Sequence, residues 1–392
     1  MEQNQTPDRP RRRSPYQRSR RLQGQYLSWL LVGTVALFAV LSLLGKDREF
    51  SESENRKLAQ FPELSVSTLA DGSFLEGLGD YAADQFPGRD TWISMNLWMN
   101  ETLGQKEVSG VYLCEDGYLM QVPGEPNETQ LQRNLKAISA FGKRHEDLNI
   151  VMSVIPNAVT VLSGKLPENA PVRDQIVDLV TIKTGVEHVN FVDATSAMSS
   201  HNEEDLFFRT DHHWTSLGAY YGYAAILEAM GMEPQPLGQQ VTVSDDFNGT
   251  LYSTSGVHWL EPDEIHTYVP DNGDVYVTAN TGEGFIGGGL YVPEKLEGKD
   301  KYTYFLGGNQ PLYIIENPNA ATDKKLLVLR DSYADSLAPF LSQDFAEIHL
   351  LDLRYYRTPV AAYAEQMGAD AILVSYSVDN FQKDENIIFM GQ

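Results

Sequence analysis

The chain has 392 residues, of which 30 are lysine or arginine and 54 are aspartate or glutamate, so its formal net charge is -24. Binding to nucleic acid needs a basic surface, so this acidity argues against a nucleic-acid partner. Cys114 is the one cysteine, which excludes an intramolecular disulfide and a zinc site built from several cysteines. Its apolar neighbours predict that Cys114 is a small buried residue.

Residues 27–44 form an apolar run without a charged side chain. As a helix the run would be about 27 Å long, close to the roughly 30 Å hydrocarbon core of a bilayer. It lacks an Ala-x-Ala-like cleavage site, which argues against a cleaved signal peptide. The residues before it include seven arginines, at positions 9, 11, 12, 13, 18, 20 and 21. Such a bias keeps the basic side in the cytoplasm. We therefore predict a basic cytoplasmic tail over residues 1–26, disordered over 1–24, a single transmembrane helix over 27–44, and an extracytoplasmic remainder.

Two regions are predicted beyond the anchor. Residues 45–106 are expected to form a stalk and then helical segments, one of which, Gly77 to Trp98, is interrupted at Pro87. Residues 107–392 are expected to form one α/β domain. Its predicted hairpin and strands are residues 111–113 with 118–120, 148–155, 188–192, 325–329, 348–353 and 371–374, and its predicted helices are 128–144, 171–184 and 215–230, with Thr215 as N-cap.

The longer strand segments are continuous apolar runs, which is typical of strands buried on both faces of a sheet. Residues 235–315 differ, with short strands and many glycine, tyrosine and threonine turns. We therefore predict a doubly wound parallel sheet covered by helices and interrupted by a β-rich insertion over about 235–315.

Ser332 follows the apolar strand 325–329 and precedes a predicted helix. This is a usual place for a nucleophile, because the hydroxyl is exposed at the carboxyl end of the strand and backbone N–H groups can bind an oxyanion. A serine needs a base. Asp211 lies two residues before His213, so in an extended turn the two side chains can face one way. Asp211 would then orient His213, and His213 would take the proton of Ser332.

Other interpretations of these residues stay open. Asp331 and Ser332 suit an N-cap, and Asp211 with His212 and His213 suit a metal site. Because no further ligand stands at a helical spacing, we predict neither a metal nor a cofactor. His212 is expected to be a supporting or packing residue, and Trp214 to be buried at a helix start. Arg209 and Arg330 are candidates either to bind substrate or to pair with flanking aspartates.

The chain resembles the DHHW family, bacterial proteins related to the alginate O-acetylation proteins and the wider SGNH hydrolase-like group. The resemblance covers most of the outer domain and rests on segments in a fixed order: Ser53–Arg56, Asp84–Asp90, Gly110–Leu113, Arg209–Thr215, Asp246–Tyr252, Gly307–Asn309 and Asp331–Tyr333. It implies an SGNH-like fold, with Ser332 as nucleophile and Asp211 and His213 as the Asp-x-His motif that precedes it. The family's oxyanion glycine and asparagine do not map by motif, so Gly307, Gly308 and Asn309 are only candidates.

The resemblance implies a function for the outer domain: O-acetyl transfer or acetyl-ester hydrolysis on a polysaccharide, at the outer face of a bacterial cell membrane. It also implies a partner, a multi-pass membrane O-acyltransferase that supplies the acetyl group. Two other functions stay open, a non-catalytic glycan-binding or assembly protein of the cell envelope and a metal-dependent phosphoesterase at the Asp-His-His cluster.

Overall fold

The computed structural model describes residues 15–51, 53–271 and 273–391. The chain divides into two compact units, Met1–Met95 and Asn96–Gln392. The division falls inside helix α4 (Arg89–Thr102), earlier than the boundary near residue 107 that the sequence predicts. We describe each unit by itself.

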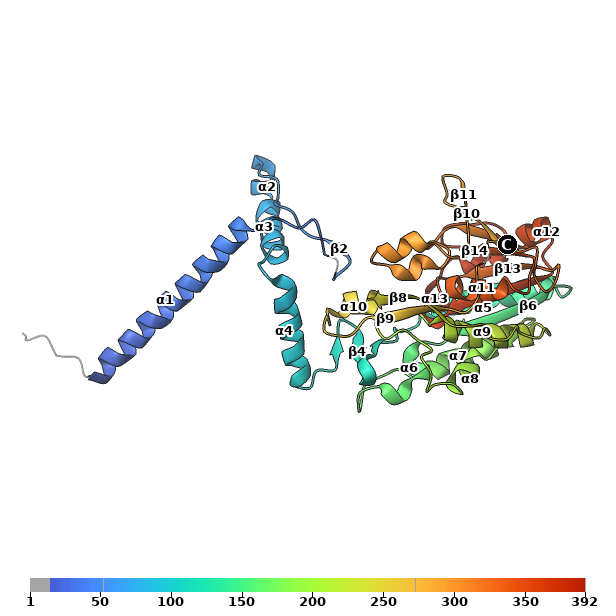
Figure 1. Cartoon of the computed structure of the whole chain (residues 1–392), viewed down its shortest axis with the longest axis horizontal. Helices are drawn as coiled ribbons and strands as arrows, with labels where there is room; N and C mark the ends of the chain where they lie inside the picture. Colours follow the sequence, from blue (N-terminus) through green and yellow to red (C-terminus); the bar gives the residue numbers. More distant parts are fainter. Residues whose placement is uncertain (1–14, 52, 272, 392) are drawn as a thin grey trace, which may run out of the picture. The chain divides into compact units, whose positions relative to one another are not determined.

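The first unit begins with one long helix, α1 (Pro15–Leu44) (Figure 1). Its Leu22–Ser42 segment has 21 residues and, within the described part of the chain, is the one helix long and apolar enough to cross a membrane. The helix starts before the predicted span, so the last part of the predicted basic tail is helical. Residues 1–14 of that tail lie outside the described residues.

Short elements follow α1 in this unit: β1 (Phe50–Ser51), β2 (Arg56–Lys57), α2 (Val66–Ala70), α3 (Ser73–Asp84) and α4. The predicted interruption at Pro87 is confirmed, because α3 ends before it and α4 begins after it. Asp84, the last residue of α3, accepts hydrogen bonds from both terminal nitrogens of Arg56, at 2.9 and 2.6 Å, and from the Ala59 N–H at 2.8 Å. This carboxylate therefore ties the β1–β2 hairpin to α3.

The second unit is built on an eight-stranded mixed sheet of spatial order β11-β10-β12-β14-β13-β15-β6-β7. Its strands are β6 (Asn149–Ile155), β7 (Asn190–Val192), β10 (Tyr276–Asn280), β11 (Phe285–Gly288), β12 (Leu312–Glu316), β13 (Lys325–Arg330), β14 (Glu347–Leu351) and β15 (Ala371–Ser377). The run β14-β13-β15-β6-β7 is parallel, and β12, β10 and β11 extend it antiparallel. The predicted parallel sheet is therefore confirmed for these five strands, whereas the sheet as a whole is mixed. The three antiparallel strands come from the β-rich insertion, where hairpin-like connections replace the helical crossovers that parallel strands need.

Helices cover both faces of the sheet. Within β13, Leu326 and Val328 belong to one hydrophobic cluster, whereas Leu327 and Leu329 belong to another, because successive side chains of a strand point to opposite faces. The helices packed in the first cluster are α6 (Ala158–Val161), α8 (Ala194–Ser199), α9 (Ser216–Ala229) and α11 (Ala334–Leu341). Those in the second are α5 (Glu128–Arg144), α7 (Gln175–Gly185), α12 (Val360–Met367) and α13 (Val378–Lys383). The parallel part of the sheet is therefore doubly wound.

Counted from β13, the parallel strands lie in the spatial order 2-1-3-4-5, which is the flavodoxin-like order. The fourth and fifth strands of this order, β6 and β7, come before the other three in the sequence. In such sheets ligands bind beyond the carboxyl ends of the strands, where the order reverses. That point lies between β13 and β15.

The remaining strands form two small sheets: β3 (Glu107–Val108), β4 (Val111–Leu113) and β5 (Leu119–Gln121) in one, and β8 (Val241–Phe247) with β9 (Asp263–Thr267) in the other. Helix α10 (Thr250–Ser255) follows β8. Cys114, just after β4, is half-buried, and burial raises the pKa of its thiol to about 12. The thiol is therefore a protonated packing group.

Candidate active site

Ser332 lies at the carboxyl end of β13, in the turn before α11. The neighbouring Asp331 is fully buried, and its Oδ1 accepts the Tyr333 N–H at 3.1 Å within the turn. Its Oδ2 accepts hydrogen bonds from the Ser377 N–H and from Asn380 Nδ2, both at 2.8 Å, so the turn is fixed to the end of β15. The N-cap of α11 is Tyr333, which makes no side-chain capping hydrogen bond, so the N-cap interpretation of Asp331 and Ser332 is wrong. Asp331 fixes the turn, and the half-buried hydroxyl of Ser332 has a different partner.

That partner comes from a tight loop between Phe207 and Trp214, which pair across the loop in an antiparallel bridge. Buried Asp263 fixes the loop, because its carboxylate accepts hydrogen bonds from the N–H groups of Arg209 and Thr210 at 2.9 and 2.8 Å. The loop then leads into α9, where Thr215 is the N-cap and accepts the Gly218 N–H, as predicted.

Three side chains from two distant parts of the sequence, separated by 119 positions between His213 and Ser332, form a hydrogen-bonded chain. His213 Nε2 lies 2.8 Å from Ser332 Oγ, and His213 Nδ1 lies 2.6 Å from Asp211 Oδ1. An ionised Asp211 accepts the proton of Nδ1, which leaves Nε2 as the acceptor for the serine hydroxyl. The structure thus brings together the three residues named from the sequence, in the order that acyl transfer requires.

Asp211 is kept ionised although it is buried. Burial alone would raise the pKa of this carboxyl group, but the two adjacent imidazoles, His212 and His213, and the hydrogen bonds from His213 and the Thr250 N–H outweigh burial. The pKa of Asp211 is therefore held well below its usual value. Its second oxygen, Oδ2, accepts both the Thr250 N–H at 2.7 Å and the Thr250 hydroxyl at 2.9 Å.

Thr250 is supplied by the N-terminus of α10, and Gly249 makes that approach possible. A Cβ atom on Gly249 would lie 2.3 Å from Asp211 Cβ and 2.5 Å from Asp211 Oδ2. The segment Asp246–Tyr252 was noticed in the sequence only as part of the family resemblance, without a role. Its role is to bring a glycine and a hydroxyl donor against the buried aspartate.

Tyr302 is a site residue that the sequence did not reveal. Its ring stacks on the His213 imidazole, with centroids 3.8 Å apart and planes within 8° of parallel. Its hydroxyl donates to the Ser332 backbone oxygen at 3.1 Å and lies 3.0 Å from Ser336 Oγ. Tyr302 therefore contacts the His213 ring and the peptide unit of Ser332 at once. It stands among several tyrosines of the insertion, and no spacing singled it out.

His212 and Trp214 support the loop. His212 Nδ1 lies 2.7 Å from the Thr250 hydroxyl, and desolvation, with His213 beside it, lowers the pKa of His212 to about 4. His212 is therefore a neutral residue beside the ionised Asp211. Trp214 is fully buried, and its Nε1–H donates to the Tyr333 backbone oxygen at 3.0 Å and to Ser336 Oγ at 2.9 Å. The expectation that Trp214 is buried at a helix start is confirmed.

The two candidate arginines make ion pairs with residues other than their neighbours in sequence. Arg330 is fully buried and pairs with Asp335 of α11 at 2.6 Å, so it does not face solvent where a substrate would arrive. Burial raises the pKa of Asp335 to about 7, although Arg330 opposes this shift. Arg209 pairs with Asp263 at 3.4 Å and keeps a partly exposed side chain.

The turn of Gly307, Gly308 and Asn309 lies before β12, and both glycines have positive φ, 94° and 110°. The Gly307 N–H donates to Thr303, next to Tyr302. Among the described residues, no recorded hydrogen bond or ring contact joins these three residues to Ser332 or His213. Their role at an oxyanion stays a prediction.

The alternative of a metal site has a geometric basis. One ligand atom each from Asp211, His212 and His213 lie within 4.8 Å of one another. However, Asp211 occupies Nδ1 of His213, Ser332 occupies Nε2, and Thr250 occupies Nδ1 of His212. A metal bound through these atoms would have to displace these hydrogen bonds. The Asp211–His213–Ser332 arrangement is made of two of them and needs no rearrangement.

Comparison with known proteins decides the family. The family model for DHHW proteins matches residues 54–113 and 180–351, more than half of the chain. The chain belongs to the DHHW family. No curated protein matches it.

Two solved structures, a DHHW family protein and PatB1, share this fold. A DHHW family protein from Eubacterium siraeum is 23% identical, with 72% of this chain and 95% of that chain covered and a TM-score of 0.63. Bacillus cereus PatB1 is 24% identical, with 70% and 97% covered and a TM-score of 0.59; it has also been solved with a sulfonyl adduct. The O-acetyltransferase domain of Pseudomonas putida AlgJ matches at 15% identity, with 70% and 93% covered and a TM-score of 0.43.

Proposed function

We propose that this DHHW protein is a membrane-tethered acyl-transfer enzyme, an O-acetyltransferase or acetylesterase that acts on a polysaccharide outside the cytoplasmic membrane. The observation that carries the proposal is the unbroken chain from Asp211 through His213 to the Ser332 hydroxyl, with contacts of 2.6 and 2.8 Å. A buried aspartate, an oriented imidazole and a hydroxyl at the end of a strand are the parts that a serine nucleophile needs.

In the proposed reaction, Ser332 Oγ attacks the carbonyl carbon of an acyl ester while His213 Nε2 takes its proton. The tetrahedral intermediate collapses, His213 returns the proton to the departing alcohol, and the acyl group stays on Ser332. His213 then deprotonates an acceptor hydroxyl, which attacks the acyl-serine and carries the acyl group away. The acceptor is a sugar hydroxyl in a transferase and water in an esterase.

We assign the Ser332 backbone N–H to the oxyanion that forms in each half-reaction. The next N–H, that of Tyr333, is already held by Asp331 Oδ1. Within the described chain, no recorded hydrogen bond engages the Ser332 N–H. A donor at the nucleophile's own residue, before a helix, is well placed for an oxyanion. A second hydrogen-bond donor to the oxyanion would come from the acceptor substrate or from the turn of residues 307–309.

The strand order supports an SGNH-like classification with a permuted chain. The usual SGNH arrangement places the serine first and the Asp-x-x-His motif last. Here the strand that bears Ser332 is the first of the 2-1-3-4-5 order, and the Asp211–His213 loop follows β7, the fifth. The fourth and fifth strands of this order, β6 and β7, come before the first strand, β13, in the sequence. His213 therefore precedes Ser332 in sequence, although the spatial order of the strands is kept.

The proposed location rests on α1. A helix with an apolar segment of 21 residues suits a bilayer, and the arginines before it favour a cytoplasmic N-terminus. The second unit then lies outside, beside the place where a multi-pass O-acyltransferase would release an acyl group. The net charge of -24 favours a neutral or basic polymer over an acidic one.

Hydrolysis of 4-nitrophenyl acetate by the full chain in detergent tests the chemistry, with and without neutral oligosaccharides as acceptors. We expect turnover that Ser332→Ala abolishes and that Ser196→Ala, at an exposed serine on α8, retains. Acetyl groups found on the sugar would identify a transferase, and release to water alone an esterase. Absence of turnover in the parent would favour the non-catalytic alternative, and equal turnover in Ser332→Ala would refute Ser332 as the nucleophile.

A further inference from the structure

Arg330 carries a buried charge that takes no part in the proposed reaction. It is the last residue of β13, two positions before Ser332, and its side chain is fully buried. Its Nη1 donates to Asp335 Oδ1 at 2.6 Å, whereas Nε and Nη2 have no hydrogen-bond partner within the described chain. A buried ion pair that leaves donors without a protein partner is a poor source of stability, because the desolvation of both charges offsets their attraction. Stability alone therefore does not account for Arg330.

The same guanidinium contacts the peptide group that joins Asp331 to Ser332. The Asp331 backbone oxygen accepts Arg330 Nη1 at 3.4 Å and the Ala334 N–H at 3.2 Å. A peptide group is planar and trans, so its N–H points away from its carbonyl oxygen. Two donors on the Asp331 oxygen, one of them a cation, therefore direct the Ser332 N–H away from Arg330 and strengthen it as a donor.

The backbone groups on the other side of Ser332 are also fixed. The Ser332 backbone oxygen accepts the Tyr302 hydroxyl at 3.1 Å and the Asp335 N–H at 3.2 Å. The Tyr333 N–H donates to Asp331 Oδ1. The turn thus offers the Ser332 N–H from a peptide group whose orientation is set on both sides.

Arg330 also reaches the residue that closes the turn 307–309. Its guanidinium carbon lies over the ring of Tyr313, 5.5 Å from the ring centroid. Tyr313 belongs to β12, so the Arg330 side chain spans β14, which lies between the two strands. The buried Tyr313 hydroxyl donates to the Gly308 backbone oxygen at 2.6 Å. One guanidinium therefore contacts both places from which a donor to the oxyanion is expected.

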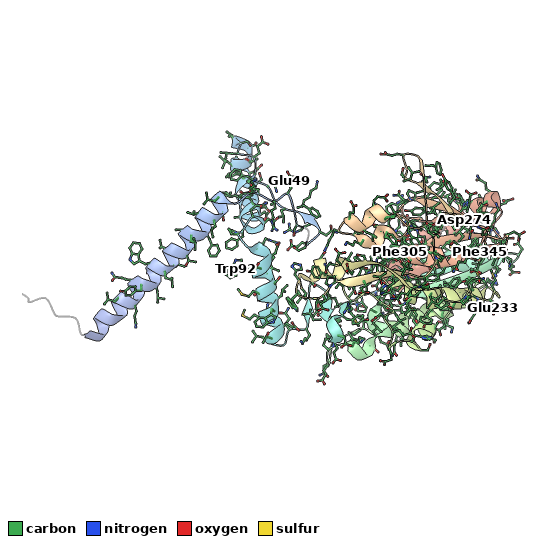
Figure 2. All side chains as sticks on the ribbon, in the orientation of Figure 1. Glu49, Trp92, Glu233, Asp274, Phe305 and Phe345 are labelled. Atoms are coloured by element: carbon green, nitrogen blue, oxygen red, sulfur yellow. The ribbon has the colours of Figure 1, made fainter. Side chains whose placement is uncertain are left out.

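The start of the turn 307–309 is anchored from a second direction. Phe305 is fully buried among the packed side chains of the second unit (Figure 2), and its ring centroid lies 5.6 Å from that of Tyr302. The Gly307 N–H donates to the Thr303 backbone oxygen at 3.0 Å. The turn is therefore held on both sides, and each side leads back to Ser332 through contacts of buried groups.

We propose that Arg330 is a positioning residue for the oxyanion formed at Ser332, holding the Ser332 N–H and, through Tyr313, the turn 307–309 toward the same point. The proposal rests on the proposed acyl transfer and deepens it. Arg330 is buried and does not touch substrate, so its effect arises only where negative charge develops on the acyl oxygen. An interaction made only in the transition state changes kcat and leaves KM nearly unchanged.

The first test removes the charge pair as a unit. Arg330→Met alone would leave Asp335 buried without its partner, so the variant is Arg330→Met with Asp335→Leu. We expect its midpoint of urea unfolding to be equal to or higher than that of the full-length parent. With 4-nitrophenyl acetate, kcat should fall about 10- to 100-fold and KM should stay within about twofold. The matched control, Arg173→Met with Asp178→Leu, removes an ion pair at α7 and should keep the parent's kinetics.

An aryl trifluoromethyl ketone distinguishes positioning from a general loss of packing. Its hemiketal with Ser332 places an oxyanion in the site without turnover, so its inhibition constant reports the donors to the oxyanion. We expect this constant to rise in the double variant by about the factor by which kcat/KM falls. Parent kinetics in the double variant, or a lower kcat with unchanged inhibition by the ketone, would overturn the proposal.

Tyr313→Phe tests the link to the turn 307–309 with little risk to folding. It keeps the ring beneath Arg330 and releases the Gly308 oxygen, so kcat and the affinity for the ketone should both fall about three- to tenfold. Tyr376→Phe is the control, because the buried Tyr376 hydroxyl has no hydrogen-bond partner among the described residues. Equal kinetics in these two variants would overturn the link to the turn.

Ser332→Ala, measured in parallel, separates this inference from the proposed function. A parent without turnover that depends on Ser332 would refute the proposed function and the role of Arg330 with it. Turnover that depends on Ser332 and that the Arg330→Met, Asp335→Leu variant retains in full would refute the role of Arg330 alone.

Discussion

At the scale of single residues, His213 is fixed by contacts on several sides. Asp211 holds Nδ1, Ser332 meets Nε2, and the ring of Tyr302 covers one face of the imidazole. The imidazole therefore has its orientation settled before any substrate arrives. Such preorganisation matters because a displacement of about 1 Å at a reacting group can cost about 100-fold in rate.

Tyr302 is predicted to act as a positioning residue through its ring more than through its hydroxyl. Tyr302→Leu removes the stack, and we expect kcat to fall about 10- to 100-fold with KM nearly unchanged. Tyr302→Phe keeps the ring and loses only the hydrogen bonds to Ser332 and Ser336, so it should retain most of the activity. Steady-state kinetics with an acetyl ester, across a range of pH, measures both.

Tyr304→Leu provides the matched control. Tyr304 is also buried in the insertion, but its ring stacks on Tyr291 rather than on His213. If Tyr304→Leu lowers kcat as much as Tyr302→Leu does, the effect is a general loss of packing and the positioning role is refuted.

At the scale of elements, the site is the meeting point of three segments that are distant in sequence. The Phe207–Trp214 loop supplies His213, the β13–α11 turn supplies the Ser332 hydroxyl, and the N-terminus of α10 supplies the donors to Asp211. The close approach of α10 to Asp211 depends on Gly249.

Gly249→Ala is therefore predicted to damage the site without unfolding the domain. The new methyl group would push the Asp211 carboxylate away from His213, and we expect kcat/KM to fall about 100-fold or more. The φ of Gly249 is -78°, so the backbone itself accepts alanine. Gly164→Ala, where a Cβ meets nothing within 4 Å, should be silent. Wild-type kinetics in Gly249→Ala would show that the approach is looser than the structure indicates.

The first unit carries a pH-dependent tie at Asp84. The hydrogen bonds of Arg56, helped by the Ala59 N–H, lower the pKa of Asp84 to about 2 despite desolvation. A depressed pKa stabilises the folded state above the unfolded-state value near 4, and that stabilisation is lost as the pH falls from about 4 to 2. Asp84→Asn should therefore reduce hydrogen-exchange protection in α3 several-fold at neutral pH. The difference from the parent should shrink toward pH 2.

Asp80→Asn serves as the control for this tie, because Asp80 is an exposed residue of the same helix. Equal loss of protection in both variants, or a difference at Asp84 that does not change with pH, would argue against the carboxylate–arginine tie.

Most of the second unit's elements follow from sequence periodicity. Helix α5 begins and ends where expected, and strands β6, β13 and β15 coincide with the apolar runs. The antiparallel extension β12-β10-β11 could not be predicted from the sequence, because strand pairing in the insertion depends on long-range register rather than on local pattern. At the site, residue chemistry and sequence position were enough to predict Asp211, His213 and Ser332. They were not enough to predict Tyr302, Asp263 and Gly249, since the roles of these residues exist only through contacts between distant segments.

At the scale of the whole molecule, one chain combines an apolar helix and a serine site. Protease protection of intact cells that express the full chain tests the arrangement. We expect an N-terminal tag to be protected and a C-terminal tag to be digested from outside, because the arginines precede the apolar segment. A protected C-terminal tag, with digestion after lysis as the positive control, would place the chemistry on the cytoplasmic side and refute the proposed location.

The central claim is that Ser332 carries the acyl group, and an acid-quenched reaction of the full chain with 4-nitrophenyl acetate tests it most directly. Peptide mass spectrometry of the quenched protein should find acetyl on Ser332 within the first turnover, and none on that peptide in Ser332→Ala. A sulfonyl fluoride, which reacts with activated serine hydroxyls, should compete for the same residue. Turnover that continues in Ser332→Ala, or acetyl that accumulates on another residue while Ser332 stays unmodified, would contradict the account.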